Sequence, residues 1–130
     1  MLTLALFVAA AGLLTSCNPE TVLGRNLEGD WNITSFSEDG TELIGNLLTS
    51  AEFEFGEYDG DEGSFKLTIV DFTGGTSVAQ GDYELNADGD EVELIYTDGS
   101  KETYDVTVDG NEMEMVGVID GFRYEIRGEM

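Results

Sequence analysis

The chain has 130 residues, with 28 acidic and 5 basic side chains, a formal net charge of −23 and no histidine. This charge excludes nucleic-acid binding, because no basic surface is present to neutralise phosphates. The lack of histidine excludes a Ser-His-Asp triad, a Cys-His pair and a histidine zinc site. No glycine-rich phosphate loop with a lysine is present either, so we expect a protein without enzymatic activity and without a cofactor.

The N-terminal run from Leu2 to Leu14 is almost entirely apolar. A helix needs roughly 20 apolar residues to cross a bilayer, so this run is too short for a span and has the length of a secretory signal. The run leads into Leu-Thr-Ser-Cys, which resembles the lipobox of bacterial lipoproteins. In that family the signal is cut just before the cysteine, which carries a diacylglycerol. The resemblance therefore implies a signal peptide at residues 1–16 and lipidation of Cys17.

Cys17 is the only cysteine of the chain, so it has no internal disulfide partner, and lipidation explains its presence. An ordinary signal peptide followed by an unmodified cysteine is the alternative. We expect a cell-envelope protein whose lipid anchor makes the membrane its partner. Asn18 follows the cysteine, and the absence of aspartate there favours the outer membrane. Residues 17–26 are expected to form the lipidated cysteine and a short tether, and residues 27–130 the folded domain.

From residue 27 onward, apolar and polar residues alternate with period two, which is the pattern of half-buried strands. Asp-Gly pairs, which favour tight hairpins, separate the alternating segments. From Asp88 onward these pairs recur every 10–11 residues, a spacing that suits a meander of short strands. The apolar positions of the successive segments are Trp31 and Ile33; Phe53 and Phe55; Phe65, Leu67 and Ile69; Tyr83 and Leu85; Val92, Leu94 and Tyr96; Tyr104, Val106 and Val108; Met113 and Met115; and Phe122, Tyr124 and Ile126.

About eight strands, each with one apolar face, predict an all-β domain. A closed barrel or a two-sheet sandwich can bury such faces, and successive tight hairpins favour an eight-stranded up-and-down barrel. Closure also removes exposed sheet edges. The segment Thr41–Ser50 breaks the alternation, and Leu43, Ile44, Leu47 and Leu48 recur at helical spacing. It predicts a short helix or a packed loop after the first strand, closing one end of the barrel.

Two short motifs carry a family resemblance. Gly29-Asp30-Trp31 lies on the first strand, and Gly81-Asp82-Tyr83 lies in the middle of the meander. In this order, soon after a lipoprotein cysteine, they resemble the lipocalin-like lipoproteins of Bacteroidetes-type bacteria, over residues 24–130. The resemblance implies an eight-stranded lipocalin-like barrel and no particular ligand. We expect the ring of Trp31 to plug one end of that barrel and to pack against the last strand.

The barrel interior is the leading candidate site. Barrels of eight strands are either filled by side chains or hold one small ligand. Inward aromatic and methionine side chains suit an apolar or amphipathic molecule, which tyrosine hydroxyls can orient. The alternative is a structural or protein-interaction module with a filled barrel, whose acidic surface meets a basic protein or cations. The candidate ligand-binding residues are Phe53, Phe55, Tyr83, Tyr96, Tyr104, Met113, Met115 and Tyr124.

Two acidic loops are weak calcium candidates, because calcium prefers oxygen ligands on flexible turns. One loop carries Asp59, Asp61 and Glu62, and the other carries Asp88 and Asp90. Neither matches the spacing of an EF-hand, and solvated hairpin turns are the favoured interpretation. We therefore expect no resident metal.

Overall fold

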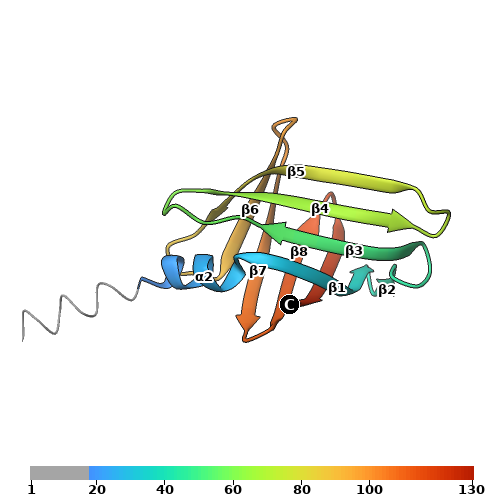
Figure 1. Ribbon diagram of the computed structural model, residues 1–130, viewed down its shortest axis with the longest axis horizontal. Helices are drawn as coiled ribbons and strands as arrows, with labels where there is room; N and C mark the ends of the chain where they lie inside the picture. Colours follow the sequence, from blue (N-terminus) through green and yellow to red (C-terminus); the bar gives the residue numbers. More distant parts are fainter. Residues whose placement is uncertain (1–17) are drawn as a thin grey trace, which may run out of the picture.

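The structure, a computed structural model, describes residues 18–130. The predicted signal peptide and Cys17 lie outside the described residues. Within the described range the only helix is too short to span a membrane. That helix, α2 (Pro19–Leu27), precedes nine strands (Figure 1). They are β1 (Gly29–Glu38), β2 (Thr41–Glu42), β3 (Leu48–Phe55), β4 (Gly63–Asp71), β5 (Thr76–Leu85), β6 (Glu91–Tyr96), β7 (Lys101–Asp109), β8 (Glu112–Ile119) and β9 (Phe122–Glu129).

Strand β1 and strands β3–β9 form a closed antiparallel barrel, which confirms the predicted fold. From β3 to β9 each strand pairs with the next along the chain, and β1 closes the barrel by pairing with both β3 and β9. The first residues of β1, Gly29–Asn32, pair with β3, and its later residues pair with β9. A bulge between Ile33 and Ser35 separates the two pairings and bends the strand.

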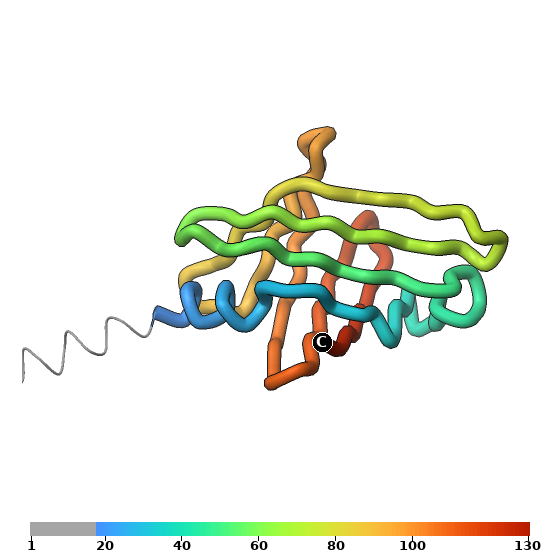
Figure 2. Tube along the Cα trace, viewed as in Figure 1, coloured from blue at the N-terminus to red at the C-terminus, as the bar shows by residue number. Residues whose placement is uncertain are grey.

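Tight turns bring the strands back on themselves, as the Asp-Gly pairs predict. Asp39-Gly40 and Asp120-Gly121 have positive φ at both residues, at 49° and 83° and at 53° and 86°, which is the pattern of a type I′ turn. The hairpins that follow β1, β4, β6 and β8 lie at one end of the barrel, which we call the open end. Because successive hairpins of an antiparallel meander alternate between the two ends, the hairpins that follow β3, β5 and β7 belong to the other, closed end. Helix α2 contacts β5 and β7 at this end and lies beside the β3–β4 and β5–β6 turns (Figures 1 and 2).

Helix α2 covers the closed end and corrects one expectation. Residues 18–26 were expected to be a tether, but Pro19–Leu27 are helical, and Leu23 and Leu27 are buried in the core. The Asn18 side chain caps the helix by accepting a hydrogen bond from the Glu20 amide at 2.9 Å. The helix is stabilised because its apolar side chains pack on the apolar end of the barrel. An extended tether would leave that end exposed to water.

The predicted burial of Trp31 at one end of the barrel is confirmed, whereas the packing of its ring against the last strand stays a prediction. The Trp31 side chain is fully buried, and its indole N–H donates to the Leu27 carbonyl at 2.8 Å. The bond satisfies a carbonyl in the last turn of α2, where no helical donor remains. Trp31 therefore fixes the helix to the first strand and closes the barrel.

The segment Thr41–Ser50 takes the loop alternative and not the helical one. After the two residues of β2 the chain turns at Gly45, whose φ of 86° is incompatible with a right-handed helix. Ile44 packs against the core, whereas Leu47 is exposed. Glu42 fixes the loop by accepting hydrogen bonds from the Ser35 hydroxyl and from the amides of Phe36 and Ile44.

Candidate functional site in the open end of the barrel

The barrel interior is packed at the closed end and hollow toward the open end. A cavity of about 190 Å³ extends from core residues such as Phe53 to residues beside the open-end hairpins, such as Tyr96 and Tyr124. Ordinary small-molecule pockets measure roughly 300–1,000 Å³, so this one suits only a small ligand. Its lining is apolar apart from one carboxylate and three phenols. The lining residues are Phe36, Phe53, Leu67, Leu94, Tyr96, Glu102, Tyr104, Tyr124 and Ile126.

Glu102 is the carboxylate of the cavity, and it was not among the predicted site residues. Its Oε1 accepts hydrogen bonds from Tyr96 Oη at 2.5 Å and from Tyr104 Oη at 3.0 Å. The sequence could have revealed it, because Glu102 lies two residues before the inward Tyr104 on the same strand, and side chains two residues apart point to the same face. An inward carboxylate breaks the usual rule of apolar inside and acidic outside.

The position of Tyr104 depends on a glycine of the neighbouring strand. A Cβ atom at Gly117 would lie 2.7 Å from the Tyr104 ring and 2.7 Å from the Thr103 carbonyl oxygen. These contacts are too close for any side chain, so Gly117 gives the ring the space it occupies. The strand pair β7–β8 thereby brings the phenol of Tyr104 to Glu102.

A second carboxylate lies at the rim. Tyr124 Oη donates to Glu38 Oε2 at 3.2 Å, and the Tyr124 ring meets Phe36 edge-on, with the ring centroids 6.2 Å apart. The open end of the cavity thus combines aromatic rings with two carboxylates, Glu102 and Glu38, which accept hydrogen bonds from tyrosine hydroxyls. Aromatic rings and a few polar groups are the usual means of orienting a bound small molecule.

All five tyrosines of the chain have raised pKa values. Burial raises the pKa of Tyr96 and Tyr104, and the Glu102 carboxylate raises both further. Burial raises the pKa of Tyr83 to about 12, with a contribution from the charge of Glu28. Burial and a neighbouring carboxylate act in the same direction on Tyr58 and Tyr124. The cavity phenols are therefore protonated donors at neutral pH.

The structure divides the eight predicted ligand-binding residues into two groups. Four of them line the cavity: Phe53, Tyr96, Tyr104 and Tyr124. The other four are buried but do not line it, namely Phe55, Tyr83, Met113 and Met115. Alternation alone predicts the inward face and not the depth along the barrel, so it could not separate the two groups.

Two of the calcium candidates, Asp59 and Asp90, form side-chain hydrogen bonds within their own turns. Asp59 accepts hydrogen bonds at 2.9 Å from the amides of Asp61 and Glu62, and these backbone bonds lower the Asp59 pKa. The side-chain amide of Asn86 donates to Asp90 at 2.5 Å. Among residues 18–130, the one group of three carboxylates close enough to share an ion lies elsewhere, at Asp30, Glu52 and Glu54 on the exposed face of β1 and β3.

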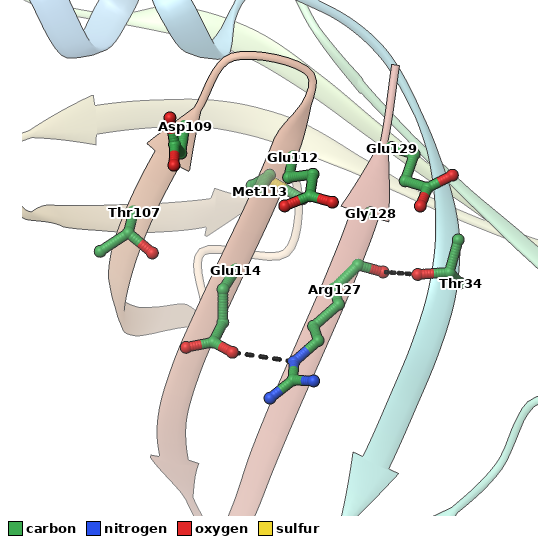
Figure 3. A pocket seen from close by; sticks show the side chains of 9 residues that line it. All are labelled: Thr34, Thr107, Asp109, Glu112, Met113, Glu114, Arg127, Gly128 and Glu129. Carbon is green, nitrogen blue, oxygen red and sulfur yellow. Dashed lines mark hydrogen bonds and ion pairs between the residues drawn. The ribbon is translucent and has the colours of Figure 1, made fainter.

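A groove of about 380 Å³ lies on the outer face of β7, β8, β9 and β1 (Figure 3). Four of its nine lining residues are carboxylates, namely Asp109, Glu112, Glu114 and Glu129. Its one cation, Arg127, is paired with Glu114 at 2.9 Å. Such a polar, open surface is typical of a solvated sheet face and offers little apolar contact to a ligand.

A closed meander of eight antiparallel strands, capped at one end and hollow at the other, defines a small up-and-down barrel whose interior opens at one end. The family model described as a lipocalin-like domain matches residues 27–115. The chain belongs to this family.

Solved structures of the same fold support the architecture. A redesigned β-barrel has a TM-score of 0.64 at 15% identity, over 83% of this chain and 94% of that one. A second redesigned barrel, bound to DFHBI, has a TM-score of 0.60 at 15% identity, over 83% and 98% of the two chains. Japanin from Rhipicephalus appendiculatus, bound to cholesterol, has a TM-score of 0.56 at 10% identity, over 78% and 74%. No curated protein sequence matches this chain.

Proposed function

We propose that this protein binds a small apolar or amphipathic molecule, without catalysis, in the open end of its barrel, and that a lipid on Cys17 anchors it in the cell envelope. The observation that carries the binding function is the apolar cavity of about 190 Å³. A completely filled barrel, which the alternative function requires, would leave no such space. Solved barrels of the same fold, bound to DFHBI and to cholesterol, support the proposal by analogy.

The binding proposal is tested by filling the cavity. Leu67 lines it, and Leu67→Phe adds volume there, whereas Val118→Phe adds volume on the exposed outer face of β8. We expect native mass spectrometry of residues 18–130, after exposure to a lipid extract, to show an organic adduct on the wild type and on Val118→Phe. Leu67→Phe should lose it, because the ligand and the larger ring compete for one space. Circular dichroism should show that both variants are folded.

Two results would contradict binding in the cavity. One is a bare mass for the wild-type protein across extracts of the native envelope. The other is an adduct that Leu67→Phe retains in full, which would place the ligand outside the barrel.

The anchor is tested separately with Cys17→Ser. We expect this variant to lose acylation and to accumulate as an uncleaved precursor, because the thioether needs the sulfur. Metabolic labelling with a fatty acid and fractionation of the cells measure both effects. A variant that is processed normally and remains in the membrane fraction would refute the lipid anchor.

A further inference from the structure

The cavity holds a carboxylate with no cationic partner. The chain has five basic residues, and four form ion pairs with outward carboxylates: Lys66 with Glu54, Lys101 with Glu93, Arg123 with Glu125, and Arg127 with Glu114. The fifth, Arg25, lies in the last turn of α2 at the closed end. None of the five lines the cavity, so Glu102 faces it without a balancing charge.

The Glu102 carboxylate is half-buried, and one of its oxygens stays open to solvent. Both phenols donate to the same oxygen, Oε1, and no hydrogen bond from residues 18–130 reaches Oε2. A carboxylate has about four acceptor positions, and each phenol oxygen can accept a bond after donating its only proton. The mouth therefore presents several acceptors and no free donor to an incoming group. An ammonium group, with three donors and no acceptor, complements this arrangement.

Two further properties favour a positive ligand. The rings of Phe36, Tyr104 and Tyr124 line the cavity, and the faces of such rings attract cations through their quadrupoles. The net charge of −23 creates a negative potential that raises the local concentration of cations and repels anions. A fatty acid would bring its carboxylate next to Glu102 and would be repelled.

We propose that the open-end cavity selects a small organic cation, an amine with a compact apolar body, whose ammonium binds Glu102 between Tyr96 and Tyr104. This inference rests on the proposed binding function and names the ligand class of the same site. The cavity volume limits the apolar body to about the size of one aromatic ring with a short chain.

The test uses three probes that share a phenyl ring and differ in charge: phenethylamine, phenethyl alcohol and phenylacetate. Residues 18–130 contain α2 and the complete barrel core, and they are titrated by NMR in about 0.15 M NaCl, where surface electrostatics are screened over about 8 Å. We expect the amine to bind at least about tenfold more tightly than the alcohol, as a hydrogen bond to a charged group allows, and phenylacetate to bind most weakly. The shifted resonances should belong to the lining residues.

Glu102→Gln is the decisive variant, and Glu84→Gln is its matched control. Glu84 is exposed on the outer face of β5, so its substitution changes the net charge equally without touching the cavity. We expect Glu102→Gln to lose about tenfold or more in affinity for the amine and to keep its affinity for the alcohol. Glu84→Gln should leave both affinities within about twofold, since an exposed charge contributes little.

The outcomes separate the two proposals. Equal binding of amine and alcohol, or an amine affinity that Glu102→Gln does not reduce, would overturn the selection of cations while leaving the binding function intact. No binding of any probe, together with a bare mass after exposure to envelope extract, would overturn both.

Discussion

Alkaline titration should unfold this protein in one cooperative step between about pH 11 and pH 12, with tyrosine ionisation and loss of structure occurring together. Free tyrosine has a pKa of about 10, and every tyrosine of the chain is raised above it in the folded state. The folded state therefore favours the neutral phenol. Stability from this source is complete below pH 10 and is lost as the pH rises toward the folded pKa values.

The size of the effect follows from the buried phenols. The pKa of Tyr83 is raised to about 12, so Tyr83 alone removes about 2–3 kcal/mol of stability by pH 12. Tyr104 is also buried and its pKa is raised further, which at least doubles the loss. A domain of this size has roughly 5–15 kcal/mol of stability in total. The combined loss is therefore a large fraction of the total free energy of unfolding.

Phenolate absorbance and circular dichroism, recorded on the same samples, measure the transition. Tyr83→Phe is the control, because it removes one ionisable group together with the hydrogen bond to the Gly56 carbonyl at 2.7 Å. Stability at neutral pH should fall by about 1–3 kcal/mol. Above pH 10 the free energy of unfolding of Tyr83→Phe should fall less steeply with pH than that of the wild type, because unfolding releases one proton fewer. Tyrosines that ionise near pH 10 in a folded barrel would contradict the burial described for them.

Replacing Trp31 by alanine should lower the free energy of unfolding by about 3–5 kcal/mol, the usual cost of deleting a buried aromatic side chain. The ring is fully buried, and its N–H bonds the Leu27 carbonyl, so the substitution leaves both a cavity and an unpaired carbonyl. Because the ring fixes α2 to β1, we also expect the helix to become susceptible to proteolysis.

Urea denaturation followed by circular dichroism measures this loss, since Trp31 is the only tryptophan and the variant has no indole fluorescence. Trp31→Phe keeps an aromatic ring and should lose only about 1–3 kcal/mol, mainly for the hydrogen bond. Val118→Ala, at an exposed position, should change stability by less than about 0.5 kcal/mol. A loss below about 1 kcal/mol in Trp31→Ala would mean that the ring does not close the barrel.

The barrel could be predicted from sequence because its physics is local. Alternation assigns one face of each strand to the interior, and Asp-Gly pairs supply the positive φ that tight hairpins need. Closure follows because eight half-apolar strands must bury their faces. What alternation could not provide is depth along the barrel, so Phe55 and Met115 were grouped with residues that line the cavity.

The sequence analysis did not predict two features, helix α2 and the inward position of Glu102, and the reasons differ. Helix α2 is short and has few apolar residues, so periodicity did not reveal it, although Asn18, Pro19 and Glu20 are typical of a helix start. Glu102 was missed because an acidic residue was assigned to the outer face by type, although its position in the alternation places it inside. Position should therefore outweigh residue type in such a strand, and the exceptions are the candidates for function.

The location of α2 determines which way the barrel opens relative to an anchor. The helix begins at Pro19, two residues after Cys17, and it lies at the closed end of the barrel (Figure 1). A lipid on Cys17, as proposed, would hold the closed end against the bilayer and direct the mouth outward. Ligand exchange would then take place with the aqueous compartment, and a molecule dissolved in the membrane would first have to leave it.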